Sequence, residues 1–217
     1  MSDNSLVEEL EAFKAERLLP VVGAGLTSLA DGAVGDEKKL LQVALANEMA
    51  VSELAAAWMP STSEVDVKLA FARQAGDEAS HFQLVADRLT ALGFNVADFR
   101  MPAESPLFEY LRSLSSPVER IAAGLFTLES IAYAVNENFM AFCTRRGDEE
   151  TARIYRAYIQ PDERAHQQLG RKLLAKYATE PRLHQAARET VAKVLEISTV
   201  ARAQAAVRVG TACFPGC

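Results

Sequence analysis

Apolar residues recur along most of this chain at intervals of three and four positions, the spacing that places them on one face of an α-helix. The pattern predicts four long helices, each stopped by a residue that a helix tolerates poorly. These helices cover residues 36–59, 63–92, 117–146 and 148–177. A short helix at 5–18 precedes them, and a further long helix at 181–209 follows.

The lengths of the connections predict how these helices are arranged. Only a few residues separate the first bundle helix from the second and the third from the fourth, so each pair should form an antiparallel hairpin. The segment between the pairs, 93–116, can run the length of a bundle at about 3.3 Å per extended residue. We therefore predict an all-α protein: a four-helix bundle of two hairpins joined by a long crossover, with extra N- and C-terminal helices.

Three parts of the chain follow from this pattern. Residues 1–35 should form an N-terminal helix and a Gly-rich linker, and residues 36–177 the bundle. Residues 178–217 should form a C-terminal helix and tail that packs on the bundle or at a dimer interface. The linker contains Val-Val-Gly-Ala-Gly-Leu, which is similar to a dinucleotide-binding turn, but no strand–helix–strand pattern surrounds it. We expect an irregular segment packed on the domain.

Composition and charge exclude several classes of protein. The 217 residues include 11 Gly and 8 Pro and are 49% hydrophobic, which favours helices over strands. The formal net charge is −6, and no basic stripe is present to neutralise phosphates, so we expect no nucleic-acid partner. Charged residues interrupt the apolar stretches, so no membrane span is expected. The acidic N-terminus is unlike a signal peptide, and the odd number of cysteines favours the reducing cytoplasm.

Residues with metal-binding chemistry interrupt the apolar stripes of the second and fourth bundle helices. The sequence Asp-Glu-x-x-His occurs twice, at residues 77–81 and 162–166, and accounts for two of the three histidines. A Glu and a His three positions apart lie on one helix face, so both can reach one metal ion or two neighbouring ions. Converging buried carboxylates repel one another and need a partner, and a cation is the natural one.

Each hairpin also needs a carboxylate from its other helix. In the first bundle helix the candidates are Glu48 and Glu53, and the depth of Glu48 in the hairpin matches that of Glu78 better. In the third bundle helix the candidates are Glu129 and Glu137, and depth does not choose between them. The parallel with the first hairpin favours Glu129.

The aspartate before each motif glutamate has a different expected role. Asp77 and Asp162 should point towards a neighbouring helix, where each can accept a proton from the second nitrogen of a ligand imidazole and so orient the ring. The predicted metal ligands are Glu48, Glu78, His81, Glu129, Glu163 and His166. Four carboxylates with two imidazoles nearly balance two divalent cations and suit Fe or Mn, although these ligand types do not exclude Zn.

On these residues the chain resembles the ferritin-like di-iron carboxylate superfamily, over about residues 36–177. Glu48 stands 30 residues before Glu78, and Glu129 stands 34 residues before Glu163. These separations are similar to those of the oxygen-activating branch, which includes ribonucleotide reductase small subunits and bacterial multicomponent monooxygenases. The duplicated motif is unlike classical ferritins, whose two ferroxidase halves are unequal.

The resemblance implies a ferritin-like bundle that holds two Fe ions, with Mn or mixed Mn/Fe as alternatives. It assigns the bridging role to Glu78 and Glu163, one iron to Glu48 and His81, and the other iron to Glu129 and His166. Asp77 and Asp162 would hydrogen-bond to the ligand imidazoles.

The implied function is a di-iron oxidase or oxygenase that uses O₂ to oxidise a small organic substrate. A ferroxidase or iron-handling protein, or a manganese or peroxide-consuming protein, is the alternative. Tyr133, one turn after Glu129, is a candidate redox or hydrogen-bonding partner at the centre, with core packing as its other interpretation. Glu137, one turn further, is a candidate alternative ligand or a hydrogen-bonding partner of a ligand. We expect a homodimer and consider a separate reductase as a candidate partner.

The C-terminal cysteines do not extend this site by themselves. Cys213 and Cys217 form a Cys-x-x-x-Cys pair near the end of the sequence, and no second pair accompanies them. A rubredoxin-like iron centre is therefore not expected, which argues against a full-length rubrerythrin.

Overall fold

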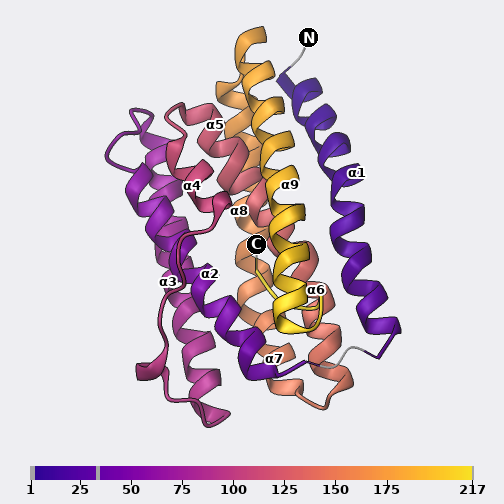
Figure 1. The fold of residues 1–217 in the computed structure, drawn as a ribbon. Helices are drawn as coiled ribbons and strands as arrows, with labels where there is room; N and C mark the ends of the chain where they lie inside the picture. Colours follow the sequence, from indigo (N-terminus) through magenta and orange to yellow (C-terminus); the bar gives the residue numbers. More distant parts are fainter. Residues whose placement is uncertain (1–2, 33–34, 217) are drawn as a thin grey trace.

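Helices make up the regular structure of the computed structural model, which describes residues 3–32 and 35–216 and contains no strand among them (Figure 1). The all-α prediction is confirmed. The elements in chain order are α1 (Asp3–Ala30), α2 (Glu37–Trp58), α3 (Val65–Ala91), η1 (Val96–Asp98), α4 (Pro106–Ser113), α5 (Pro117–Ile121), η2 (Ala122–Leu128), α6 (Glu129–Arg145), α7 (Glu149–Ile154), η3 (Tyr155–Ile159), α8 (Gln160–Tyr177) and α9 (Pro181–Val209). None of these helices has an apolar stretch of the length that crossing a bilayer requires.

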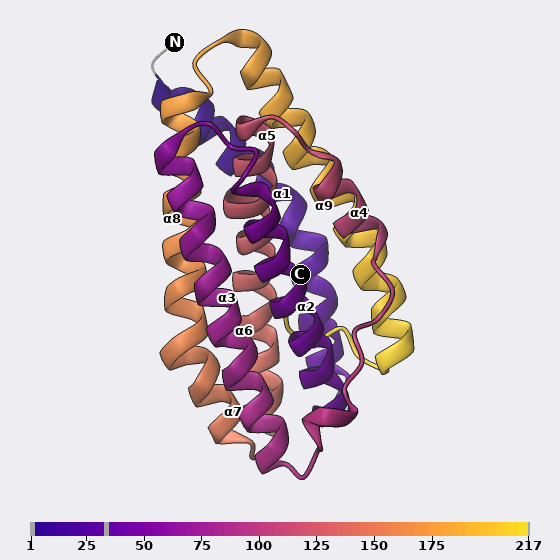
Figure 2. The same ribbon diagram turned by 90° about the vertical axis from the view of Figure 1, so that its left-hand side faces the viewer.

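Two long helical rods each consist of three labelled elements. The elements η2 and η3 are π-helical, and the residues at their junctions keep helical backbone angles, so α5–η2–α6 and α7–η3–α8 are each continuous. Gly147, with a φ of 82°, makes the tight turn between these rods. The rods are antiparallel to each other, as are α2 and α3 (Figures 1 and 2).

The long connection between the two helix pairs returns the chain from one end of the molecule to the other (Figure 2). It contains η1 and the short amphipathic helix α4, which the sequence pattern did not separate from the crossover. Ser105 begins α4 by accepting a hydrogen bond from the amide of Phe108 at 3.4 Å. Buried Leu107, Phe108 and Leu111 fix α4 to the helices beneath it, and α4 packs against α2 and α9.

The N-terminal segment differs from the prediction. Residues 19–30, expected to be irregular, form the second half of α1, and residues 33–34 of the predicted linker lie outside the described residues. Gly25 has no room for a side chain, because a Cβ there would overlap the amide of Asn138 in α6. Asn138 donates a hydrogen bond to the carbonyl of Val22 at 3.0 Å. Close packing on α6 thus stabilises the helix and outweighs the low helix propensity of glycine.

Both π-helical stretches lie just before glutamates of the predicted site. The stretch η2 ends immediately before Glu129, and η3 ends four residues before Glu163. Gly170 of α8 packs on the backbone of η2, where a Cβ would lie 2.8 Å from the amide nitrogen of Phe126. Buried Lys14 of α1 donates to the Phe126 carbonyl at 3.1 Å. Such π-helical turns often occur at functional sites, and here they set the rotation of the two rods around the site.

The tail that follows α9 turns back into the molecule rather than leaving it (Figure 1). Residues 211–216 are buried apart from half-buried Ala212. Arg202 of α9 donates to the carbonyls of Phe214 and Gly216, and the Gly216 amide donates to the Asn136 side chain of α6 at 3.1 Å. These bonds hold the end of the described chain between α2, α6 and α9. Cys217 lies outside the described residues.

Candidate metal centre

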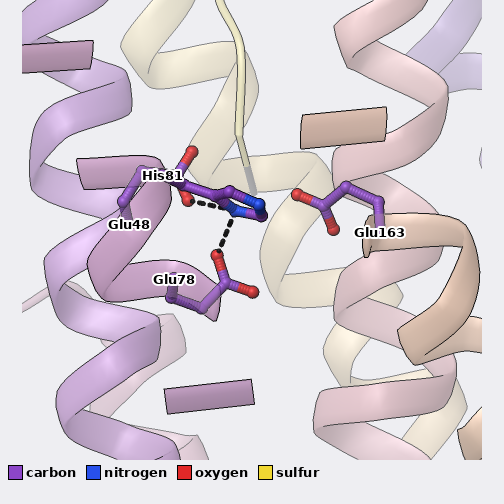
Figure 3. Close-up of side chains that lie close together, drawn as sticks. All are labelled: Glu48, Glu78, His81 and Glu163. Carbon is purple, nitrogen blue, oxygen red and sulfur yellow. Dashed lines mark hydrogen bonds and ion pairs between the residues drawn. The ribbon is translucent and has the colours of Figure 1, made fainter. Parts of the chain in front are cut away.

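Six buried side chains from four helices converge inside the molecule. They are Glu48 of α2, Glu78 and His81 of α3, Glu129 of α6, and Glu163 and His166 of α8. Each is at most 5% exposed. Figure 3 shows one part of the group, in which His81 lies between Glu48 and Glu78 on one side and Glu163 on the other.

The six residues form two overlapping groups. One contains Glu48, Glu78, His81 and Glu163, and the other contains Glu78, Glu129, Glu163 and His166. Within each group the candidate ligand atoms lie within 4.8 Å of one another, close enough for one metal ion to contact them all. Glu78 and Glu163 belong to both groups. The arrangement can therefore hold a metal ion in either group.

The two histidines face the carboxylates in the same way. His81 Nδ1 is 3.0 Å from a Glu78 oxygen and 3.5 Å from a Glu48 oxygen. His166 Nδ1 is 3.5 Å from oxygens of Glu78 and Glu129. Each imidazole thus presents Nδ1 to the centre, which leaves Nε2 for a partner on its far side.

The two motifs exchange their aspartates. His81 Nε2 is 3.3 Å from Asp162, and His166 Nε2 is 3.0 Å from Asp77. Each aspartate therefore contacts the imidazole of the other motif, on the neighbouring helix. A carboxylate in this position fixes the tautomer with Nδ1 free to bind a metal and makes the imidazole more basic.

The Asp77→Asn variant should bind metal about 10- to 100-fold more weakly, because the His166 ring loses its charged partner. Chelator competition measures the change, and circular dichroism checks that the helices persist. Asp87→Asn is the matched control, since Asp87 is exposed on the same helix and accepts a hydrogen bond from Gln83 at 2.7 Å, away from the centre. Equal losses in the two variants would show that Asp77 has no specific role.

Several polar atoms in the centre lack a hydrogen-bond partner among the described residues. They are Glu78 Oε1, Glu163 Oε2 and His166 Nδ1. Leaving a buried polar atom unpaired costs about 1–3 kcal/mol, and more for a charged group. A cation between these atoms would satisfy all three. The donor set of carboxylates and imidazoles thus fits a divalent metal ion.

In the absence of a cation, protons take its place. Burial lowers the pKa of His81 and His166, but the surrounding carboxylates outweigh it and raise each pKa to about 11. Burial raises the pKa of Glu48 to about 8, and burial with the nearby Glu129 carboxylate raises that of Glu163 well above its usual range. Burial also disfavours the charged form of Glu78, yet the His166 and His81 imidazoles beside it hold its pKa below the ordinary value.

Other contacts at the centre were not predicted. Buried Gln74 donates to a carboxylate oxygen of Glu129, and Gln167 donates to the Glu129 backbone carbonyl at 3.1 Å. Gln74 lies four residues before Glu78 on the same face of α3, so a polar residue in that apolar stripe was the available signal. Tyr155 is fully buried, its hydroxyl has no hydrogen-bond partner among the described residues, and the pKa of its phenol is raised by burial and by the Glu48 and Glu163 charges.

The structure does not bring Tyr133 and Glu137 into the two groups of ligand atoms. The Tyr133 hydroxyl accepts a hydrogen bond from exposed Arg164 at 3.0 Å, and exposed Glu137 accepts one from Gln160 at 2.7 Å. Successive residues of a helix are rotated by about 100°, so positions four and eight after Glu129 turn progressively away from its direction. Buried Ala132 and Asn136 occupy the inner face of α6 instead.

A small cavity of about 10 Å³ adjoins the carboxylates. Its walls are the four glutamates together with Asn47, Val51, Leu128, Ala132 and Gly216. This space suits about one water-sized molecule. Gly216, at the end of the described tail, therefore forms part of the wall of the centre.

The fold and this site define a helical protein with a buried carboxylate–imidazole centre able to hold metal. A family model described as "Protein of unknown function (DUF455)" matches residues 42–205, and the chain belongs to that family. The matched segment contains all six residues of the centre and both aspartates. Among curated proteins and solved structures, no match to the chain was found.

Proposed function

We propose that this protein is a di-iron oxidase or oxygenase of the ferritin-like superfamily that uses O₂ to oxidise a small organic substrate. The observation that carries the proposal is the pair of overlapping ligand groups that share Glu78 and Glu163. Two antiparallel helix pairs and a long crossover support the superfamily assignment, because that superfamily builds its metal site from such pairs (Figure 2).

The shared carboxylates support a specific arrangement of ligands. Glu78 and Glu163 would contribute to both ligand sets, Glu48 and His81 would complete one of them, and Glu129 and His166 would complete the other. Iron bound there would supply O₂ binding and one-electron chemistry. Mn, or one ion of each kind, fits the same donors.

The chain's own residues would prepare the centre in three ways. Asp162 and Asp77 hold the imidazole rings so that Nδ1 faces inward. Gln74 orients the Glu129 carboxylate through its hydrogen bond. Val51 and Leu128 line the small cavity with apolar surface, which excludes bulk water and strengthens the electrostatic interactions within.

A second candidate function, a ferroxidase, draws support from the size of the cavity. The space of about 10 Å³ beside the carboxylates admits O₂ or water but no organic molecule without movement of its walls. Oxidation of Fe(II) as the substrate needs no larger space.

Anaerobic loading with Fe(II) followed by exposure to O₂ tests the proposal. The protein should bind about two iron ions per chain, as a paired carboxylate site requires, and should then consume O₂. An oxidase or oxygenase should stop after one turnover of its own iron unless a reductant and substrate are added. Continued oxidation of excess Fe(II) would favour the ferroxidase. Binding of fewer than one ion per chain, of either Fe or Mn, would contradict both functions.

A further inference from the structure

A groove with a volume of about 400 Å³ lies between α2, the crossover and α9. Its walls are mainly apolar and include Val43, Phe99, Leu107, Phe108, Ala205 and Phe214. Binding sites for small organic molecules have about this size and character. The groove is separate from the cavity at the carboxylates, which is far smaller.

The charge of the groove is opposite to that of the protein. Its lining contains Arg100, Arg202 and Arg208 and no described Asp or Glu, although the chain has a net charge of −6. Arg202 is bound to the tail carbonyls. Arg208, exposed in the last turn of α9, has no ion pair or hydrogen bond within the described part of the chain. It is therefore available to an anionic ligand.

An adjoining hollow of about 300 Å³ lies along the α2–α4 side and does contain acidic residues. Its two glutamates, Glu53 and Glu104, both form ion pairs with Arg112. Arg112 thus balances the two glutamates of the hollow. The lining of the groove itself contains no described acidic residue that could balance the positive charge at its α9 end.

Two polar atoms in the groove wall lack a hydrogen-bond partner among the described residues. They are the Oγ of Ser198, a residue that is 1% exposed, and Nδ2 of Asn47. Both atoms are buried, so a ligand in the groove would reach them only after a movement of the wall. Ser198 and Asn47 lie on α9 and α2, the two sides of the groove.

The partition between the groove and the centre is thin. Asn47 lines both spaces and directly precedes Glu48. Gly216 lies against Asn47 on the side of the centre, and Phe214 of the same tail lines the groove. Asn47 and the tail thus form part of the wall between the groove and the carboxylates.

We propose that this groove binds an organic monocarboxylic acid with an apolar chain. Its carboxylate pairs with Arg208, and its apolar chain lies along Phe99, Phe108 and Ala205 towards Asn47. The identification of this acid as the substrate rests on the proposed function of the metal centre. The binding site itself does not, because none of the six candidate ligands lines the groove.

Calorimetry with decanoate, 1-decanol and decylamine tests the proposal on the full chain, both metal-free and iron-loaded. Decanoate should bind at least about tenfold more tightly than decanol, the effect of one charge-assisted hydrogen bond. Decylamine should bind most weakly. Equal binding of all three compounds would overturn the proposal.

Three variants locate the binding site. Ala205→Trp fills the groove and should weaken decanoate binding at least about tenfold, since the apolar contact area is lost. Arg208→Gln should reduce decanoate binding to the level of decanol. Arg188→Gln, on the same helix and paired with Glu9 outside the groove, should change nothing. Decanoate binding unaffected by Ala205→Trp would place the acid elsewhere and overturn the assignment.

The outcomes separate this inference from the proposed function. Normal iron loading without decanoate binding would refute only the groove as an acid-binding site. Decanoate binding by a protein that binds no metal would refute only the di-iron function. If the protein binds both iron and decanoate, decanoate should also perturb the absorption spectrum of the iron-loaded protein. The reason is that the apolar chain of decanoate ends beside Asn47 and the centre.

Discussion

The Glu78→Gln variant should lose tight metal binding, with the affinity reduced at least about 100-fold. Loss of a hydrogen bond to a ligand already weakens metal binding by about 10- to 100-fold, and removing a shared ligand should cost more. Glu78 belongs to both groups of ligand atoms, so one substitution would weaken metal binding in either group. Glutamine has nearly the same shape, so the helices should persist. Elemental analysis after desalting measures the bound metal.

The control for this experiment is Glu53→Gln. Glu53 is exposed on α2, five residues after Glu48, and pairs with Arg112 at 3.8 Å, outside the centre. This variant should keep the metal content of the unmodified protein. Full occupancy in Glu78→Gln would instead show that the six side chains do not act as one metal site.

The metal-free protein should become less stable as the pH rises from about 6.5 towards 11, the range between the ordinary and the raised pKa of its two buried histidines. In this pH range the two histidines keep their protons in the folded chain but have released them in the unfolded chain. Glu48, with its pKa raised to about 8, adds to the loss at the lower end of this range. Each such proton lowers the free energy of unfolding by up to about 1.4 kcal/mol per pH unit.

The metal-loaded protein should show the opposite trend near neutral pH, because a bound cation replaces these protons and binds more tightly as they leave. Urea unfolding at pH 6.5, 7.5 and 8.5 measures the stability of the metal-free protein when chelator is present. The same titrations with Mn(II) measure the stability of the metal-loaded protein. The gap in stability between the two forms should widen with pH. If the stability of the metal-free protein is constant over this range, the inference that protons replace the cation in the centre is wrong. The His81→Gln/His166→Gln double variant should show a flatter pH dependence.

The residues of the centre could be found from the sequence because the chemistry is repeated. Two copies of Asp-Glu-x-x-His in apolar helical stripes identify Glu78, His81, Glu163 and His166 as a set. Helical geometry alone then places each Glu and His on one face. Only the parallel with the first hairpin favours Glu129 over Glu137. The depths of these two residues in the second hairpin match that of Glu163 equally well.

Other features depend on contacts that a local pattern does not encode. The glycines of residues 19–30 suggest a flexible segment, yet they allow close packing of α1 on α6, a fact visible only when Asn138 is placed. Tyr133 follows Glu129 by one turn, but the small rotation between them directs it to Arg164 at the surface. The π-helical turns also change the rotation of their rods in a way that regular spacing cannot predict.

The sequence predicts a C-terminal tail packed on the bundle or at a dimer interface, but it does not predict that residues 211–216 reach the centre. Its short sequence has no helical pattern, and its position depends on Arg202, which donates to two of its carbonyls. The groove beside it is lined by residues from three segments distant in sequence: α2, the crossover, and α9 with its tail. Ordinary core residues have the same composition, so only their assembly distinguishes a binding surface.

The exchange of aspartates between the motifs has a consequence for the origin of this fold. Each hairpin contains a histidine whose orienting carboxylate belongs to the other hairpin. A single hairpin on its own would therefore lack the partner that fixes its imidazole. Two identical copies facing each other would supply both contacts at once. Fusion of the genes for such a self-complementary pair would keep the geometry intact, and each half could afterwards diverge separately.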